Sequence, residues 1–244
     1  TIVELLIKNC LVLPMTEQPG RPKYYRGAVA VSGDRIALVS DSPQRIERYE
    51  RERGEGLQVA DGAGRLVMPG LINLHNHVSM TLMRGYADDL PLMPWLTEKI
   101  WPFEAKLDGD DIYSGAELGI AEMLLGGTTA FVDMYWYADR VAEAAIRSGI
   151  RAVVSPAFVG TAFDGYVERT QRMIERYNGA AGDRIRVWVA PHAPYTCTPE
   201  QIRESLKLCE RNGVGVNIHV AETLSEVETI RERYGKTPVE HLRD

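Results

Sequence analysis

Cysteine is scarce in this sequence of 244 residues, where only Cys10, Cys197 and Cys209 are present. Their number is odd and no two of them have the CxxC spacing, whereas a disulfide framework needs an even set. The sequence therefore argues against a disulfide-stabilised scaffold and favours a reducing cytoplasm as the compartment.

Clusters of basic residues and long apolar runs are also missing. Lys and Arg number 28 against 34 Asp and Glu, a net charge of −6, and the basic residues are dispersed among acids, as in RIERYERERGEG. This pattern is typical of a solvated helix face and not of a nucleic-acid-binding surface. The first segment, TIVELLIKNCLVL, alternates and carries Glu4 and Lys8, so it has neither the length of a membrane span nor the layout of a signal peptide. We expect a soluble intracellular protein that binds neither nucleic acid nor a membrane.

What the sequence does contain changes character near residue 63. Residues 1–62 read as short strands joined by turns, with a hairpin turning at Gly33 and Asp34 and a helix over residues 43–53. Residues 63–244 alternate strand and helix patterns. The candidate strands are RLVMPGLINLH, GGTTAFVDMY, GIRAVVSPAF, RIRVWVAPHA and GVGVNIHVAE. The helices are expected over residues 110–126, 137–149, 164–179, 198–213 and 225–235.

Strands that alternate with helices in this way predict a parallel sheet covered by helices. A doubly wound nucleotide-binding sheet would carry a glycine-rich turn after its first strand, but HNHVSM contains neither GxGxxG nor GxxxxGK[ST]. A (β/α)8 barrel gathers its chemistry at the carboxyl ends of several strands, and the polar residues described below follow that rule. A complete barrel takes about 250 residues, so we expect only about five βα units here. The predicted fold class is α/β, a partial TIM barrel.

Two of the five histidines, His75 and His77, end the first strand of this series. Alternate residues of a strand share one face, so the two imidazoles lie about 7 Å apart along the backbone and can reach one cation. Imidazole suits zinc better than magnesium or calcium, which prefer oxygen ligands. Taken alone, the HxH pattern leaves a metal site and two unrelated histidines equally open.

The other histidines favour the metal site. His192 and His219 each end a later predicted strand, and only His241 lies elsewhere. Four histidines at the carboxyl ends of parallel strands are expected to meet at one edge of the barrel. We therefore predict a zinc site, while Fe, Ni or Co would also accept three imidazoles. His192 is left open as a metal ligand, a substrate donor or a capping group.

Two carboxylates lie close to these strand ends. Glu222 follows His219 by three residues, where it can exchange protons with a metal-bound water and a substrate nitrogen, or simply favour a helix N-terminus. Asp133 ends another strand and is open to a supporting role at the metal or a purely structural one.

Four segments together resemble the amidohydrolase superfamily, and within it the branch of 5-methylthioadenosine/S-adenosylhomocysteine deaminases and related chlorohydrolases. The segments are PGLINLHNHVSMTLMRGYADDLPLMPWL, GGTTAFVDMYW, APHAPYTCTPE and NIHVAET. The resemblance implies a (β/α) barrel of the metal-dependent hydrolase type over residues 63–244, preceded by an N-terminal β-sandwich portion over residues 1–62. Relatives are often dimers or tetramers, which leaves a homo-oligomer open.

The resemblance also implies roles for individual residues. His75, His77 and His219 match metal ligands. The other matches are Glu222 as the proton-shuttling acid, His192 as a substrate contact and Glu104 as the residue that binds ribose hydroxyls. For Glu104 the sequence alone would indicate a solvated helix residue. The family has a further histidine after its sixth strand and a metal-binding aspartate after its eighth, and this sequence contains neither position. Pro156 stands about where some relatives carry an arginine.

Three functions are consistent with these features. The first is hydrolytic deamination of an adenine nucleoside, with methylthioadenosine or S-adenosylhomocysteine giving the inosine analogue and ammonia. The second is the same chemistry on guanine, a pterin, cytosine or an s-triazine. The third is a non-catalytic fragment or a binding protein built on part of such an enzyme, because open half-barrels expose apolar strand edges.

Overall fold

The computed structural model describes residues 4–16 and 23–243 and contains two compact units, Thr1–Gly70 and Leu71–Asp244. The units divide at Gly70, later than the boundary that the sequence predicts at residue 62. The reason is strand pairing, because β5 (Leu66–Val67) pairs with the first strand of the chain and so joins the first unit. The domain boundary of the whole protein stays a prediction.

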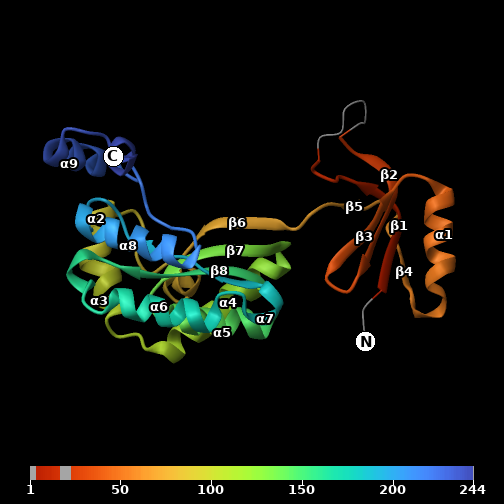
Figure 1. Ribbon diagram of the computed structural model, residues 1–244, viewed down its shortest axis with the longest axis horizontal. Coiled ribbons are helices and arrows are strands. Elements are labelled where there is room, and N and C mark those ends of the chain that lie inside the picture. The colour runs from red at the N-terminus through yellow and green to blue at the C-terminus, as the bar shows by residue number, and fades with distance from the viewer. Residues whose placement is uncertain (1–3, 17–22, 244) are drawn as a thin grey trace. The chain divides into compact units, whose positions relative to one another are not determined.

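The first unit is a five-stranded sheet with a helix beside it (Figure 1). Its strands are β1 (Glu4–Val12), β2 (Tyr25–Ser32), β3 (Arg35–Ser40), β4 (Gln58–Asp61) and β5, in the order β3-β2-β1-β4 with β5 also on β1. Helix α1 (Pro43–Arg53) begins at the expected residue because Ser42 caps it, and its Ile46 and Tyr49 pack on the core around Leu6. The predicted hairpin and helix are confirmed, and the β-sandwich stays a prediction.

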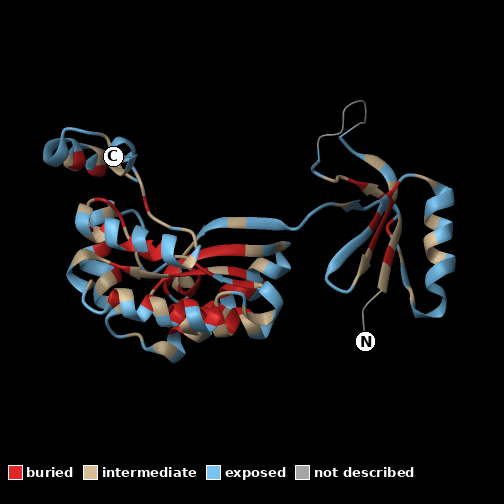
Figure 2. Cartoon of the chain, in the orientation of Figure 1, coloured by how far each residue is buried: buried red, intermediate tan, exposed pale blue. Residues whose placement is uncertain are grey.

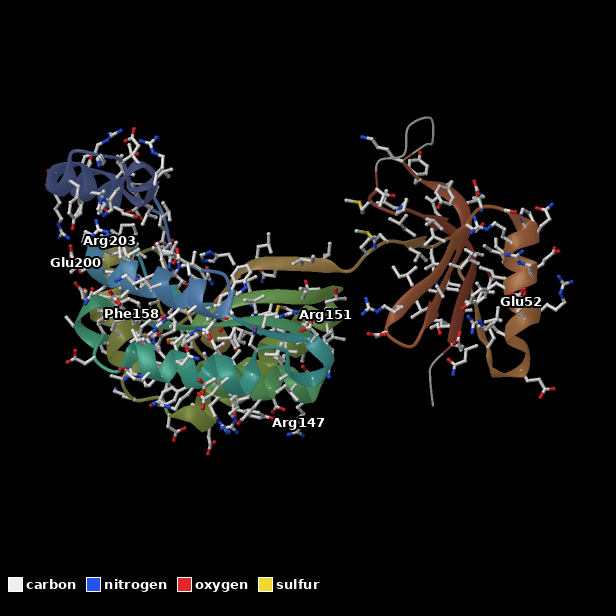
Figure 3. The ribbon with its side chains drawn as sticks, viewed as in Figure 1. Glu52, Arg147, Arg151, Phe158, Glu200 and Arg203 are labelled. Carbon is white, nitrogen blue, oxygen red and sulfur yellow. The ribbon has the colours of Figure 1, made fainter. Side chains whose placement is uncertain are left out.

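The second unit contains a sheet whose described strands all pair in parallel. Its strands are β6 (Leu71–Asn76), β7 (Thr128–Tyr135), β8 (Arg151–Phe158), β9 (Ile185–Val187) and β10 (Ala190–Pro191), in the order β10-β8-β7-β6 with β9 also on β8. In Figure 3 the labelled Arg151 and Phe158 mark the two ends of β8, and Phe158 lies at its carboxyl end. The predicted parallel sheet is confirmed for these strands.

The fifth expected strand, over residues 213–222, is only partly formed. One parallel bridge joins Val189 to Val216, and His219 N–H donates to the His192 carbonyl at 2.9 Å. The segment thus runs beside β10 without forming a continuous ladder. Pro191 contributes to this because it has no N–H to donate.

Helices link these strands, and the five that the sequence predicts are all present. They are α4 (Gly109–Leu125), α5 (Ala138–Ser148), α6 (Tyr166–Tyr177), α8 (Pro199–Asn212) and α9 (Leu224–Tyr234). Shorter pieces are α2 (Leu92–Pro94), a π-helical turn (Trp95–Ile100), α3 (Trp101–Glu104), α7 (Ala180–Asp183) and α10 (Pro238–Arg243), with 3₁₀ turns at Gly54–Gly56, Val78–Met83 and Gly160–Ala162. None of the helices within the described ranges combines the length and the apolar character that crossing a lipid bilayer requires.

The core of the second unit lies between sheet and helices, where Figure 2 shows the buried residues in red. One cluster joins Phe131 and Val154 of the strands to Ile120 and Val141 of the helices. Helix α4 also packs tightly on the turn after β6, since a β-carbon at Gly119 would lie 2.6 Å from the Val78 side chain. This contact fixes the backbone directly after the two histidines of β6.

Strand β6 is the edge of the sheet, and within the described residues no strand pairs with its outer side. Its Leu71, Ile72 and Leu74 are 52%, 64% and 73% exposed, and Figure 2 shows most of the strand as exposed. The strand that carries the HxH pattern is therefore also the open side of the sheet.

Candidate functional site

Three of the predicted site residues meet at the carboxyl end of the sheet. His75 comes from β6, His77 follows its last residue, and His219 comes from the segment beside β10. One ring nitrogen from each lies within 4.8 Å of the other two. Asn76 between the pair is turned elsewhere, with its amide 3.5 Å from the Met123 sulfur. The period of the strand thus brings together the imidazoles that the sequence singled out.

Backbone carbonyls fix the orientation of two of these rings. His77 Nδ1 lies 2.7 Å from the Met134 carbonyl oxygen, and His219 Nδ1 lies 3.0 Å from the His192 carbonyl oxygen. Because a carbonyl only accepts, each Nδ1 carries the proton and each Nε2 presents a lone pair. Carbonyl bonds of this kind are typical of histidines that ligate a metal.

The two lone pairs face each other across 3.3 Å, the distance between His77 Nε2 and His219 Nε2. Two acceptors at that distance repel unless a positive charge lies between them. Two nitrogen ligands at roughly 2.0–2.1 Å from a tetrahedral zinc ion are about 3.3 Å apart. Burial lowers the pKa of His77 to about 4, which keeps this ring in the neutral form that a metal needs. The three histidines therefore fit a borderline divalent cation.

A cavity opens beside the histidines. Its polar lining comes from His77, His219, His192, Glu104 and Glu222, and its apolar lining includes Trp95, Trp101, Trp136, Met80 and Leu96. A mostly apolar lining with a few convergent polar groups is typical of a site for a small organic molecule. All the predicted site residues thus line this cavity, except His75. His75 lies next to the cavity, because its ring nitrogen is within 4.8 Å of those of His77 and His219.

Glu104 lies in the wall of this cavity and is not the solvated helix residue that the sequence alone indicates. The Tyr135 hydroxyl donates to its Oε1 at 2.6 Å, and the Trp136 indole N–H donates to its Oε2 at 3.1 Å. Burial raises the pKa of the Glu104 carboxyl, and the two donors oppose that rise. The carboxylate is thus held in one orientation with lone pairs left for a ligand.

His192 lines the cavity beside the three-histidine group and does not belong to it. Its Nδ1 lies 3.0 Å from the Thr196 hydroxyl, and its ring centre lies 4.8 Å from that of His219. Burial lowers its pKa to about 4, with further lowering by His219 and His77. A neutral imidazole in this position can contact a bound molecule.

Sequence reasoning missed several residues of the site. Tyr135 and Trp136 reach Glu104 only through the tertiary fold, and the Tyr195 hydroxyl is buried at the cavity without a hydrogen-bond partner in the described chain. Tyr195 could have been noticed, because it stands three residues after His192 at a predicted strand end.

Asp133, which the sequence left open, supports the backbone and not the imidazoles. Its Oδ1 accepts from the Val78 N–H at 2.6 Å, directly after His77, while its Oδ2 has no partner among the described residues. Full burial raises the pKa of this carboxyl to about 7.

We expect the metal-free protein to lose stability as the pH falls from 6.5 to 4. The pKa values of His77 and His192 are about 4 in the folded protein, below the usual value near 6.5, because both rings are buried. Below pH 6.5 these histidines bind protons in the unfolded chain but not in the folded one. Proton binding therefore lowers the free energy of the unfolded state relative to the folded state. Each histidine should lower the free energy of unfolding by on the order of 3 kcal/mol at the bottom of this range. Asp133 should offset about one of these two contributions, because its pKa of about 7 in the folded protein lies above the usual value and the folded chain takes up this proton first. Urea denaturation at pH 7, 5.5 and 4 measures it.

His192→Asn should flatten this dependence by removing one of the two histidines. A free energy of unfolding that stays constant between pH 7 and 4 in the parent would contradict the assignment of buried neutral rings.

Comparisons with a family model, with curated proteins and with solved structures all point to the same family. A model of the amidohydrolase family matches residues 66–244. The chain is 43% identical over 242 residues to a 5-methylthioadenosine/S-adenosylhomocysteine deaminase of Desulfitobacterium hafniense, covering 98% of the chain and 54% of that protein. It is 44% identical over 221 residues to a 5'-deoxyadenosine deaminase of Methanothermobacter thermautotrophicus, covering 89% of the chain and 50% of that protein. A solved adenosine deaminase from Xanthomonas campestris with bound zinc is 32% identical, with a TM-score of 0.82, over 99% of the chain and 54% of that structure. The chain thus spans about half the length of the curated relatives it matches.

Proposed function

The chain belongs to the amidohydrolase family, and from this premise we propose that the protein is a metal-dependent deaminase of adenine nucleosides. The observation that carries the proposal is the convergence of three imidazoles beside a cavity that also contains Glu222 and Glu104. Metal ligands, a proton carrier and an acceptor for sugar hydroxyls are what hydrolytic deamination of a nucleoside needs. The relatives support this substrate class, since they are deaminases named for methylthioadenosine, S-adenosylhomocysteine or 5'-deoxyadenosine.

The proposal includes the architecture. The second unit would be the first five βα units of a (β/α)8 barrel, and the first unit would be part of a β-sandwich. Support comes from the parallel order of the sheet and from the open edge of β6, which in a closed barrel has a neighbour.

His75, His77 and His219 would hold the metal, which we propose to be zinc, with Fe, Ni or Co as further candidates. When bound there, a divalent ion supplies an acidified water at neutral pH. His77 and His219 keep their Nε2 lone pairs for this role, because carbonyl oxygens hold their Nδ1 protons.

Glu222 would carry the proton. Its carboxylate takes a proton from the attacking water and delivers it to the ring nitrogen next to the amino-bearing carbon of adenine. The water oxygen bonds to that carbon, and the amino group leaves with a second proton as ammonia, so that adenosine chemistry ends in an inosine analogue.

Glu104 would fix the nucleoside in place. A carboxylate held by Tyr135 and Trp136 can accept hydrogen bonds from two neighbouring ribose hydroxyls without losing its orientation. The tryptophan and methionine side chains of the cavity would cover the purine, and His192 would contact it.

Ammonia release on a substrate panel tests the proposal. The zinc-loaded protein should deaminate methylthioadenosine, S-adenosylhomocysteine or 5'-deoxyadenosine at rates far above those on guanine, a pterin, cytosine or an s-triazine. Turnover on one of the latter alone would overturn the substrate class. Stoichiometric zinc without turnover of any compound would instead favour the non-catalytic fragment.

A further inference from the structure

We propose that Glu226 is a positioning residue for Glu222, holding the backbone under the proton carrier in the one conformation that aims it at the substrate. The proposal rests on the deaminase function for its kinetic consequences, and on the hydrogen bonds of Glu226 for its structural basis.

The Glu226 carboxylate binds two successive backbone amides. Its Oε1 accepts from the Ala221 N–H at 3.0 Å and its Oε2 accepts from the Glu222 N–H at 2.8 Å. Glu226 itself is only 3% exposed, although its neighbours in the first turn of α9 are exposed or half-buried. A charged group this far from solvent is tolerated because both its oxygens are hydrogen-bonded.

The backbone that Glu226 holds is strained. Ala221 has a φ of 55°, in the left-handed region that side chains other than glycine rarely adopt. Such a conformation costs on the order of 1 kcal/mol and persists where the surroundings impose it. A left-handed residue also turns neighbouring N–H groups to the same side and so forms a concavity for an anion. Here the anion is a side chain of the protein itself.

Ordinary helix capping does not account for these contacts. In α4, α8 and α10 the side chain three residues after the cap reaches back to the N–H of the cap residue: Asp111 to Asp108, Gln201 to Thr198 and Glu240 to Thr237. In α9 the cap is Thr223, whose hydroxyl accepts from the Glu226 N–H at 3.2 Å. Glu226 stands at the same position as the other three, yet it reaches past the cap to the two residues before it.

The segment is also fixed on its other side. The His219 N–H donates to the His192 carbonyl at 2.9 Å, so the backbone is held three residues before Glu222 and again at Glu222 itself. The backbone from which the Glu222 side chain projects is therefore held by two anchors, one beside the candidate metal ligands and one at Glu226. Because a misplacement of about 1 Å can reduce a catalysed rate by about 100-fold, the second anchor has a kinetic consequence.

Glu226→Gln is the test, since an amide nitrogen cannot accept one of the two backbone N–H groups. In the zinc-loaded full chain, kcat for methylthioadenosine should fall about 10- to 100-fold, with KM changed less than about twofold and zinc content unchanged. Glu240→Gln is the matched control, because it removes the same charge from the same position of a neighbouring helix. It should leave kcat within about twofold.

A double variant separates positioning from general damage. If Glu226 acts through Glu222, then Glu222→Gln combined with Glu226→Gln should be no slower than Glu222→Gln alone. Losses that multiply, or a Glu226→Gln loss no larger than that of Glu240→Gln, would overturn the proposal.

Amide hydrogen exchange, followed by NMR, tests the hydrogen bonds from Glu226 to the Ala221 and Glu222 amides without any turnover. The Ala221 and Glu222 amides should exchange at least about tenfold faster in Glu226→Gln than in the parent or in Glu240→Gln. Unchanged exchange rates would contradict the proposal that Glu226 holds this backbone, even in an active enzyme. If the parent deaminates no nucleoside, the deaminase proposal fails, and this measurement alone decides whether Glu226 holds the segment.

Discussion

Glu222→Gln is expected to lower kcat for nucleoside deamination by about two to four orders of magnitude. Glutamine has nearly the same shape as glutamate and cannot accept and return a proton, so the cavity keeps its form while the proton path is lost. Zinc content should stay at the parental level, because the imidazoles that meet at the site are untouched. Single-turnover ammonia release and metal analysis on the same preparation measure both quantities.

Glu228→Gln provides the matched control, since Glu228 is an exposed residue of α9. It should leave kcat within about twofold. A Glu222→Gln variant that keeps more than about a tenth of the parental kcat would contradict the assignment of Glu222 as the proton carrier.

His219→Ala is expected to lose both the bound metal and the activity. The change removes one of three nitrogen donors and also the ring whose Nε2 faces His77 Nε2 across 3.3 Å. Bound metal stabilises only the folded chain, by about 2.7 kcal/mol when its concentration is a hundred times Kd. The increase in melting temperature that zinc gives the parent should therefore disappear. Metal analysis after gel filtration and melting curves with and without zinc measure these effects.

His241→Ala tests whether loss of any imidazole has the same effect. His241 stacks on Tyr234, with ring centres 4.1 Å apart, and is not among the three converging residues. It should keep zinc at the parental stoichiometry. A His219→Ala protein that retained stoichiometric zinc would contradict the three-histidine site.

The sequence predicted most of the second unit because its elements are set by local rules. Helix α8 begins where Thr198 and Pro199 predict it, and ends at Asn212, directly before Gly213, which adopts the left-handed conformation with φ 62°. The rule that parallel strands gather chemistry at their carboxyl ends found His75, His77, His192 and His219 without any contact being known. Neither step needed long-range information.

What the sequence could not supply depends on contacts between distant segments. Tyr135 and Trp136 hold Glu104 across more than 30 residues, and nothing in their own strand predicts a carboxylate partner. Glu104 itself was found only through resemblance to a family. In the sequence, Glu226 is an ordinary acid in the first turn of a helix. Its hydrogen bond to the Ala221 N–H, in place of a capping contact, is apparent only in the structure, where Ala221 has a left-handed backbone.

The three converging histidines differ in their access to solvent, since His75 is exposed, His77 is half-buried and His219 is buried. The proposed metal site would therefore have an outer ligand on β6 and an inner one against the core. Because β6 is the open edge of the sheet, the strand that pairs with it in a closed barrel would set how far solvent reaches the outer ligand.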